Sequence, residues 1–154
     1  MLDDLILRAA EEKDLFDIIR LFTEDELGAT RELLSTPLVS NYQQAFQDIQ
    51  QDKNHLLLVA EHKGSVIGTC HLTTLPSLSF KGSRRLNLEN IHVDQRFQGQ
   101  GIGTLMIKRA IEMGQEKNCR IIQLTTNKKR TEAKVFYEKL GFKATHEGMK
   151  LCLL

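Results

Sequence analysis

The segment QGQGIGT, at positions 98–104, places three glycines at alternate positions between an apolar alternating stretch and a long stretch with helical periodicity. Because glycine has no Cβ, the backbone there can adopt positive φ and approach a ligand closely. A helix that begins inside this turn would present its first N–H groups, which have no intrahelical partners, and the positive end of its dipole. The segment therefore predicts a site for a bulky anion such as a pyrophosphate, although a tight strand-to-helix turn alone would also use glycine. The residues of this predicted anion-binding turn are Gln98, Gly99, Gln100, Gly101, Ile102, Gly103 and Thr104.

Two other phosphate-binding loops do not match this turn. The dinucleotide fingerprint G-x-G-x-x-G, counted from Gly99, needs a glycine at position 104, where Thr104 stands. The phosphate loop of nucleotide hydrolases ends in Gly-Lys-Ser/Thr, but no lysine follows Gly101 or Gly103. The spacing therefore argues against both a dinucleotide site and a nucleoside triphosphate site.

The elements that position this turn can be predicted from hydrophobic periodicity. Apolar stretches predict strands at 5–7, 55–61, 65–75, 84–93 and 121–126, with a closing strand at 146–154. A Lys63-Gly64 turn predicts that the second and third strands form an antiparallel hairpin.

Helical spacing predicts four helices. The first follows Asp14, the second opens at Pro37, and the third begins inside the glycine turn. The fourth contains Val135 and ends at Gly141. We therefore expect a single α/β domain over residues 1–154, with a mixed, mostly antiparallel central sheet flanked by about four helices.

The strand RRLNLENIHV (84–93) contains a change of phase. Leu86 and Leu88 share one face, whereas Ile91 and Val93 have the opposite phase. A β-bulge at Glu89-Asn90 would restore one buried face and re-aim the glutamate. A strand that is buried on both faces would not need the bulge.

Two motifs together resemble the GCN5-related N-acetyltransferase (GNAT) superfamily. Its signature Gln/Arg-x-x-Gly-x-Gly/Ala, placed after a strand and at the start of a helix, is matched by Gln98, Gly101 and Gly103. The stretch NKKRTEAKVFYEKLGF (127–142) is similar to the second signature of the superfamily. With the predicted order of elements, the resemblance covers nearly the whole chain.

The resemblance implies acetyl-CoA as co-substrate and an amine as acceptor. In such proteins the amides of the glycine turn hold the pyrophosphate of CoA. The resemblance further implies that the main chain of Ile91, His92 and Val93 pairs with the pantetheine arm, and that Asn127 contacts this arm. No metal is implied.

The same resemblance suggests two catalytic residues. Tyr137 matches the tyrosine that protonates the CoA sulfur, and its reference pKa of about 10 lies near enough to that of a thiol for proton donation. Glu89 is the candidate base, because members often place a glutamate in this strand. A packed helix tyrosine and a solvated strand carboxylate are the respective structural alternatives.

The predicted activity is transfer of an acetyl group to a primary amine of a small molecule or protein by direct attack. None of the three cysteines lies in a motif that suggests a nucleophile, so we expect no covalent enzyme intermediate. The alternative is a non-catalytic acyl-CoA-binding regulatory domain. The acceptor could be held by the acidic stretch at 23–32 or by Arg84 and Arg85, but the sequence does not decide between them.

Composition limits the partners. The 154 residues carry a formal net charge of +1, so we expect neither a nucleic acid nor a membrane as partner. Scattered cysteines favour a reducing compartment over a disulfide framework or a structural zinc, which predicts a cytoplasmic protein. The C-terminal stretch MKLCLL could leave an apolar sheet edge, which would favour a homodimer.

Overall fold

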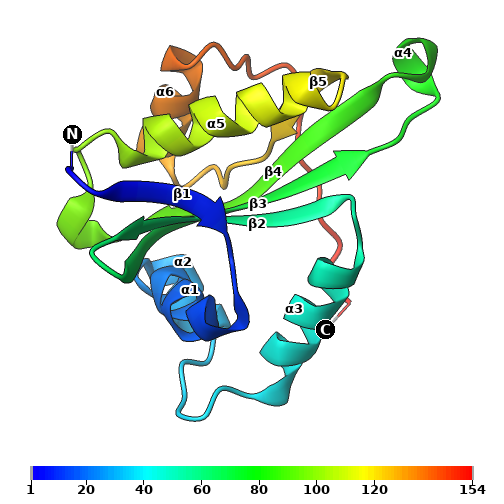
Figure 1. Cartoon of the computed structure of the whole chain (residues 1–154). Helices are drawn as coiled ribbons and strands as arrows, with labels where there is room; N and C mark the ends of the chain where they lie inside the picture. Colours follow the sequence, from blue (N-terminus) through cyan, green and yellow to red (C-terminus); the bar gives the residue numbers. More distant parts are fainter. Residues whose placement is uncertain (1, 154) are drawn as a thin grey trace.

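A computed structural model of the chain describes residues 2–153. Its central sheet has five strands in the order β1-β2-β3-β4-β5, which is also their order in the chain (Figure 1). All neighbouring strands are antiparallel except β4 and β5, which are parallel. The prediction of a mixed, mostly antiparallel sheet is therefore confirmed. The strands are β1 (Leu5–Ala9), β2 (His55–His62), β3 (Ser65–Leu75), β4 (Arg84–Val93) and β5 (Cys119–Leu124).

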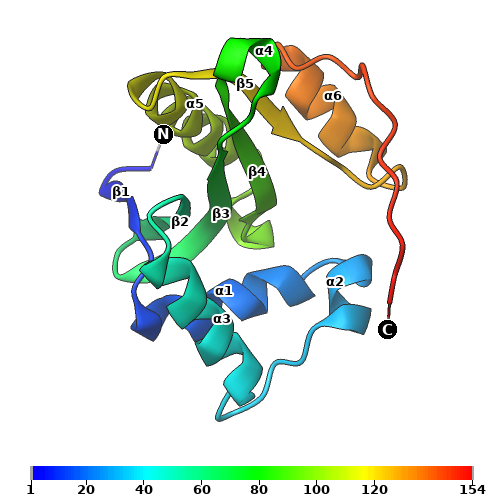
Figure 2. The same cartoon turned by 90° about the vertical axis from the view of Figure 1, so that its right-hand side faces the viewer.

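Helices cover both faces of the sheet. Helices α5 (Ile102–Glu116) and α6 (Thr131–Lys139) lie on one face. Helices α1 (Leu15–Thr23), α2 (Glu26–Arg31) and α3 (Ser40–Gln51) lie on the other (Figures 1 and 2). Single turns of 3-10 helix, η1 (Glu12–Asp14) and η2 (Gln95–Phe97), precede α1 and the glycine turn, and the short α4 (Ser79–Gly82) lies between β3 and β4.

The four predicted helices are present, and two short ones, α2 and α4, were not predicted. Helix α2 forms because the side chain of Asp25 accepts a hydrogen bond from the N–H of Gly28 at 2.6 Å, which caps the first turn. The helix expected to open at Pro37 begins at Ser40, because Val39 still has extended backbone (φ −62°, ψ 143°).

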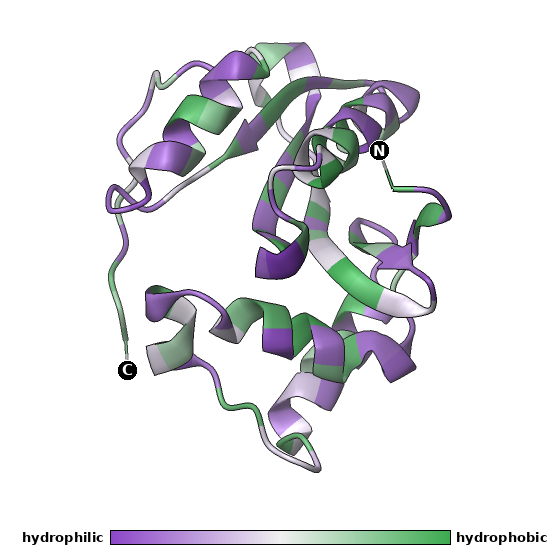
Figure 3. Ribbon diagram, turned by 90° about the vertical axis from the view of Figure 1, so that its left-hand side faces the viewer, coloured by the Kyte–Doolittle hydropathy of each residue, from purple (hydrophilic) through white to green (hydrophobic). Residues whose placement is uncertain are grey.

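Each face of the sheet buries its own apolar cluster. The α5 face includes Ile67, Leu86, Leu88, Met106 and Ile107. The α1 face includes Leu15, Ile18, Phe46, Val59 and Val66. In Figure 3 the helices carry alternating hydrophobic and hydrophilic bands, as expected of amphipathic helices that pack one side onto a sheet.

The predicted bulge in β4 is present. Thr69 pairs with His92 and His71 pairs with Glu89, so three steps of β4 oppose two steps of β3. Asn90 takes the left-handed conformation with φ 51°. The extra residue allows Ile91 and Val93 to pack in the same cluster as Leu86 and Leu88.

The predicted closing strand at 146–154 is wrong for the residues that the structure describes. Residues 143–153 contain no strand, and Leu154 lies outside the described residues. The side chains of Met149, Leu151 and Leu153 are 93%, 86% and 87% exposed. This C-terminal segment runs from α6 past the loop that follows β5 and away from the sheet (Figure 2). Apolar alternation does not specify which sheet edge a strand pairs with, so the prediction fails at this point.

Within residues 2–153, none of the helices combines the length and the apolar character needed to cross a bilayer.

Candidate active site

The glycine turn connects β4, through η2, to the N-terminus of α5. Gly99 and Gly101 have φ of 78° and 83°, and a Cβ at either position would meet nothing within 4 Å. The N–H of Leu105 donates to the carbonyl of Gly101 at 3.0 Å, so the amides of the preceding turn point out of the N-terminal end of α5. These two glycines therefore permit the backbone conformation and leave the outer side of the turn open.

Gly103 has a different role. A Cβ at this position would lie 3.3 Å from Cζ of Phe136 and 3.7 Å from Cγ2 of Val93. The missing side chain makes room for α6 to pack against α5. The sequence predicts that all three glycines clear space for a ligand; at Gly103 the missing side chain also clears space for Phe136, and the binding role of its amide stays a prediction.

The other residues of the turn hold it in place. Nε2 of Gln98 donates to the carbonyl of Val93 at 3.1 Å, which fastens the turn to the end of β4. The Ile102 side chain is 2% exposed and belongs to the core, so only its backbone can reach a ligand. Gln100 is exposed and Thr104 is half-buried.

The second half of β4 has a free edge next to the glycine turn. Pairing of β4 with β5 ends at Leu88 opposite Leu124, and beyond Leu88 the described strands pair with β4 only from the β3 side. An extended ligand can add to such an edge through main-chain hydrogen bonds. Ile91, His92 and Val93 also line a cavity of about 150 Å³, which we call the donor cavity. Its other lining residues are Leu21, Glu24, Asp25, Gln95, Gln98 and Arg130.

One side of the donor cavity is formed by the loop after β5. Nη2 of Arg130 lies 2.6 Å from Oδ2 of Asp25, which joins this loop to the start of α2. Asn127 is not among the residues that line either described cavity. Its Oδ1 accepts the N–H of Lys129 at 3.0 Å, and its carbonyl accepts the N–H of Arg130 at 2.8 Å. Asn127 therefore shapes the loop that brings Arg130 to the cavity.

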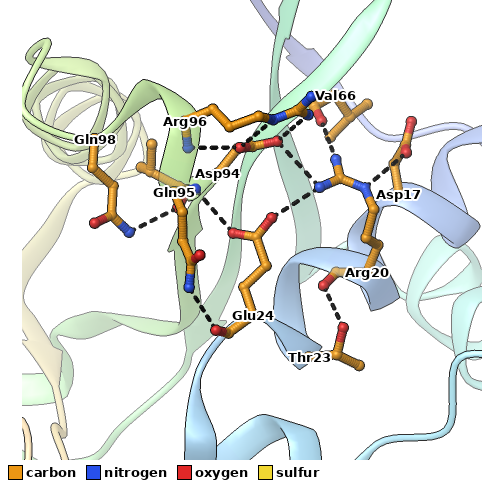
Figure 4. Close-up of polar contacts among 10 residues, drawn as sticks. Asp17, Arg20, Thr23, Glu24, Val66, Asp94, Gln95, Arg96 and Gln98 are labelled. Carbon is orange, nitrogen blue, oxygen red and sulfur yellow. Dashed lines mark hydrogen bonds and ion pairs between the residues drawn. The ribbon is translucent and has the colours of Figure 1, made fainter.

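A buried carboxylate ties α1 to the segment that leads into the turn (Figure 4). The side chain of Asp94 is fully buried and lies 2.7 Å from Nη2 of Arg96 and 3.1 Å from Nη1 of Arg20. The same nitrogen of Arg20 lies 2.9 Å from Oε1 of Glu24, whose Oε2 accepts the N–H of Gln95 at 3.0 Å. Hydrogen bonding to Arg96 is the main reason that the pKa of Asp94 is lowered to about 2. Sequence reasoning missed this network, although an aspartate directly after a strand and two residues before an arginine is a recognisable capping signal.

A second, larger cavity of about 380 Å³, which we call the acceptor cavity, lies between α1, α3 and the sheet. Apolar side chains of α1 and α3 form most of its wall, and polar groups are contributed by the sheet, by the end of α2 and by Tyr42 of α3. The polar lining residues are Arg31, Glu32, Tyr42, His71, Asn90 and His92.

His92 lines both cavities, so the two meet at the bulged part of β4. Its ring packs against Phe22 with centroids 5.1 Å apart, and burial lowers the pKa of His92 to about 4. His92 is therefore neutral near pH 7.

Tyr137 lies on α6 and packs into the cluster on the α5 face, to which Ile91 and Val93 of the free edge also belong. Its ring contacts those of Phe136 and Phe142, with centroids 5.2 and 6.0 Å away. Burial is the main cause that raises the pKa of Tyr137 to about 12, so its hydroxyl keeps its proton at neutral pH.

Glu89 lies on the same sheet face as the acceptor cavity, because it is paired across the strands with His71. Its side chain is exposed, and Oε1 accepts a hydrogen bond from Nδ2 of Asn87 at 2.7 Å. Glu89 is not among the residues that line either described cavity. The bulge thus places this carboxylate beside the acceptor cavity and not inside it.

The sequence was compared with models of known families. The model described as the "Acetyltransferase (GNAT) family" matches residues 15–142. The chain belongs to the GNAT family. It is therefore an acyltransferase, and the resemblance inferred from the two motifs is confirmed.

Relatives and solved structures agree with this family. The chain is 30% identical over 153 residues to a glucosamine 6-phosphate N-acetyltransferase of Trypanosoma brucei brucei, with 97% of each chain covered. A crystal structure described as a transcriptional regulator from Bacillus halodurans C-125 is 40% identical, has a TM-score of 0.95, and is covered over 97% of this chain and 99% of that one. A predicted acetyltransferase from Clostridium acetobutylicum, solved with acetyl-CoA, has a TM-score of 0.74 at 22% identity, over 97% of this chain and 96% of that one, and so shows the same fold.

In this GNAT domain the two arginines considered for acceptor binding lie elsewhere. Arg85 donates to Oγ of Ser79 at 2.6 Å and stacks on Phe80, and Arg84 reaches the carbonyl of Lys117. Neither lines a described cavity. Apart from Arg130, the charged residues that line them come from the stretch 23–32, which was the other sequence-based candidate.

Proposed function

We propose that this GNAT enzyme transfers the acetyl group of acetyl-CoA to a primary amine of a small molecule or protein by direct attack. One observation carries the proposal. The open glycine turn at the N-terminus of α5 and the free edge of β4 border a donor cavity that meets a second cavity at His92. This arrangement allows two substrates to meet at the bulged part of β4.

The residues present fit acetyl-CoA. The turn amides from Gly99 to Thr104, at the positive end of α5, suit a pyrophosphate. The main chain of Ile91 to Val93 suits an amide-bearing arm that adds to a strand edge, and Asn127 holds the neighbouring loop. Acetyl-CoA supplies the activated acyl group as a thioester. The related fold solved with acetyl-CoA supports this assignment.

The chemistry assigned to the side chains needs one acid and one base. Tyr137 donates its proton to the departing sulfur; its raised pKa keeps the hydroxyl protonated at neutral pH but also makes it a weaker proton donor to a thiolate. Glu89 is the proposed base and acts on the amine either directly or through an intervening group. Its position beside the acceptor cavity supports both routes.

The cysteines favour direct attack over a covalent intermediate. The thiol of Cys70 is fully buried, and burial raises its pKa to about 12, so little nucleophilic thiolate forms. Burial also raises the pKa of Cys119, and Cys152 lies in the exposed C-terminal segment. All three are free cysteines, which supports the cytoplasm as the proposed location.

The test is a panel of amines offered with acetyl-CoA, in which free CoA is followed with a thiol reagent. The panel includes glucosamine 6-phosphate, because a relative carries that name, and amino acids, polyamines and arylalkylamines. Release that depends on an amine is the expected result. Tight CoA binding without release across the whole panel would favour the regulatory-domain alternative, and failure to bind CoA would reject both.

We also propose a homodimer. The three exposed apolar side chains of the C-terminal segment alternate with Lys150 and Cys152, as in a strand with one apolar face. Among the described strands, β5 is one of the two outer strands of the sheet and pairs only with β4. In a second copy the same edge and the same segment are present, so each copy can cover the other reciprocally.

A further inference from the structure

Two histidines outside the proposed machinery are in direct contact beside the acceptor cavity. Nδ1 of His55 lies 2.9 Å from Nε2 of His71, and their ring centroids are 5.1 Å apart. On its other side, Nε2 of His55 lies 3.7 Å from Oδ2 of Asp52. His71 lines the acceptor cavity, whereas Asp52 is half exposed at the surface. The three side chains therefore form a line from the cavity to solvent.

The strand register explains why the histidines meet. His55 of β2 pairs with Thr73 of β3, and His71 pairs with Leu57, so both histidines project from one face in adjacent rows. The same register places Glu89 of β4 opposite His71 from the other side. His71 thus lies between a histidine and a carboxylate.

The pair has the features of a proton relay and lacks those of a metal site. Among the described residues, no group of three or more histidines, cysteines and carboxylates is arranged to hold a metal ion. One of two ring nitrogens in hydrogen-bond contact must donate. When Nε2–H of His71 donates to Nδ1 of His55, Nδ1 of His71 has a free lone pair and the His55 proton is on Nε2, on the Asp52 side.

We propose that His71 takes the proton of the acceptor amine and passes it through His55 toward Asp52. This inference rests on the proposed N-acetyltransferase function, but it makes His71 the base in place of Glu89 and leaves Glu89 an electrostatic role beside His71. As the C–N bond forms, the N–H bond of the amine breaks and an Nδ1–H bond forms on His71. The Nε2 proton of His71 moves to Nδ1 of His55, and the Nε2 proton of His55 leaves toward Asp52 and solvent. At the other end, the electrons of the C–S bond go to sulfur, which receives the Tyr137 proton.

Two other groups fit this role less well. Glu89 is not among the lining residues of the cavity, and its carboxylate already accepts from Asn87, but from across the strands it stabilises a positive His71 ring. His92 lines the cavity, but its pKa near 4 makes it a weak base. Burial lowers the pKa of His71, as does His55, while Glu89 opposes them, so His71 is neutral at pH 7. The titratable and charged groups that face His71 or share its cavity are His55 on β2, Glu89 and His92 on β4, Arg31 and Glu32 at the end of α2, and Tyr42 on α3.

The test uses the pH profile of kcat/KM with the best amine of the panel. An imidazole accepts a proton only while neutral, so activity falls as pH drops through the pKa of His71, which lies below 6.5. His71→Gln should lower kcat by roughly 10²–10⁴-fold and remove this acidic limb, with acetyl-CoA affinity unchanged. His71→Ala should regain part of the lost rate when imidazole is added.

Three further variants separate the routes. Glu89→Gln should keep the limb but move it to lower pH, because a negative charge near the ring is lost; a limb that disappears would make Glu89 the base itself. His92→Gln should leave the acidic limb of the pH profile at the same pH. If this variant lacks the limb, His92 would be the base in place of His71. His55→Gln should reduce kcat by a smaller factor than His71→Gln, because solvent can replace the second step of the relay.

The outcomes also separate this inference from the proposed function. Amine-dependent CoA release by the unaltered enzyme, combined with a normal rate and limb in His71→Gln, would overturn only the role of His71. A His71→Ala variant that binds CoA normally but is not rescued by imidazole would do the same. No amine-dependent release by the unaltered enzyme would overturn the proposed function, and this inference with it.

Discussion

At the scale of single residues, the proposed acid is a tyrosine with a protonated hydroxyl and the proposed base is a histidine with a neutral ring. Tyr137 is packed between aromatic rings on the α5 face, where burial raises its pKa to about 12. His71 lines the cavity on the α1 face, where burial lowers its pKa. Burial disfavours the charged form of both groups, so at the same pH the tyrosine keeps its phenolic proton and the histidine keeps an unprotonated ring nitrogen.

Tyr137→Phe tests the acid. The variant keeps the ring and its contacts but loses the proton donor, so kcat should fall by roughly 10²–10⁴-fold while acetyl-CoA affinity changes little. Steady-state kinetics and calorimetric titration with acetyl-CoA measure the two quantities. Turnover equal to that of the unaltered enzyme would reject the acid role.

At the scale of elements, the glycine turn and the Asp94 network position the end of β4 against α5 and α1. The turn depends on backbone conformation, because Gly99 and Gly101 have positive φ. The network depends on charge, because the buried Asp94 is held by two arginines.

Gly101→Ala should damage the donor site although space is available for the methyl group. A side chain at φ 83° costs about 1–2 kcal/mol, and relief of that strain would turn the amides of the α5 N-terminus away from the pyrophosphate. Thermal unfolding and CoA titration should both show a loss. The matched control is Gly148→Ala, whose Cβ would make only an ordinary 3.9 Å contact with Thr125 and which should behave like the unaltered chain. Undiminished CoA affinity in Gly101→Ala would contradict the assigned role of the turn.

Asp94→Asn should destabilise the fold by roughly 2 kcal/mol, because Arg20 and Arg96 lose a charged acceptor. The pKa of Asp94 is lowered from 3.8 to about 2, so the stability that it contributes is present above pH 4 and is lost as pH falls toward 2. Chemical denaturation across this pH range measures the effect. The difference between Asp94→Asn and the unaltered chain should shrink as pH drops, and a difference independent of pH would argue against an ionised Asp94.

At the scale of the whole molecule, the exposed apolar side chains of the C-terminal segment are the basis of the proposed homodimer. Deletion of residues 149–154 should convert a dimer to a monomer, because the apolar residues that cover the partner are removed. Leu151→Asp should do the same with one change, whereas Lys150→Ala, on the alternate side of the segment, should leave the dimer intact. Light scattering after size-exclusion chromatography measures the mass. A monomeric unaltered chain would contradict the proposal.

Features encoded by neighbouring residues could be predicted from the sequence. The hairpin follows from Lys63-Gly64, and the bulge follows from the phase change after Leu88, because both are local patterns. The contact between His55 and His71 does not follow from the turn alone, because it also depends on the register shift between Ala60 and Glu61, which brings His71 opposite Leu57. The link between Arg20 and Asp94 was not, because it depends on how α1 sits on the sheet. The C-terminal segment could not be placed for the same reason, because its alternating pattern does not specify which strand it would pair with.

The contact between Gly103 and Phe136 has a consequence for the order of events during turnover. Because the ring of Phe136 packs against the position of the missing side chain, the helix that carries the proposed acid contacts the helix that begins at the turn. When bound CoA reduces the motion of the turn, it should therefore also reduce the motion of α6. Amide hydrogen exchange in α6 should slow when CoA is added alone. Tyr137 would then be held in position by the first substrate, before any amine binds.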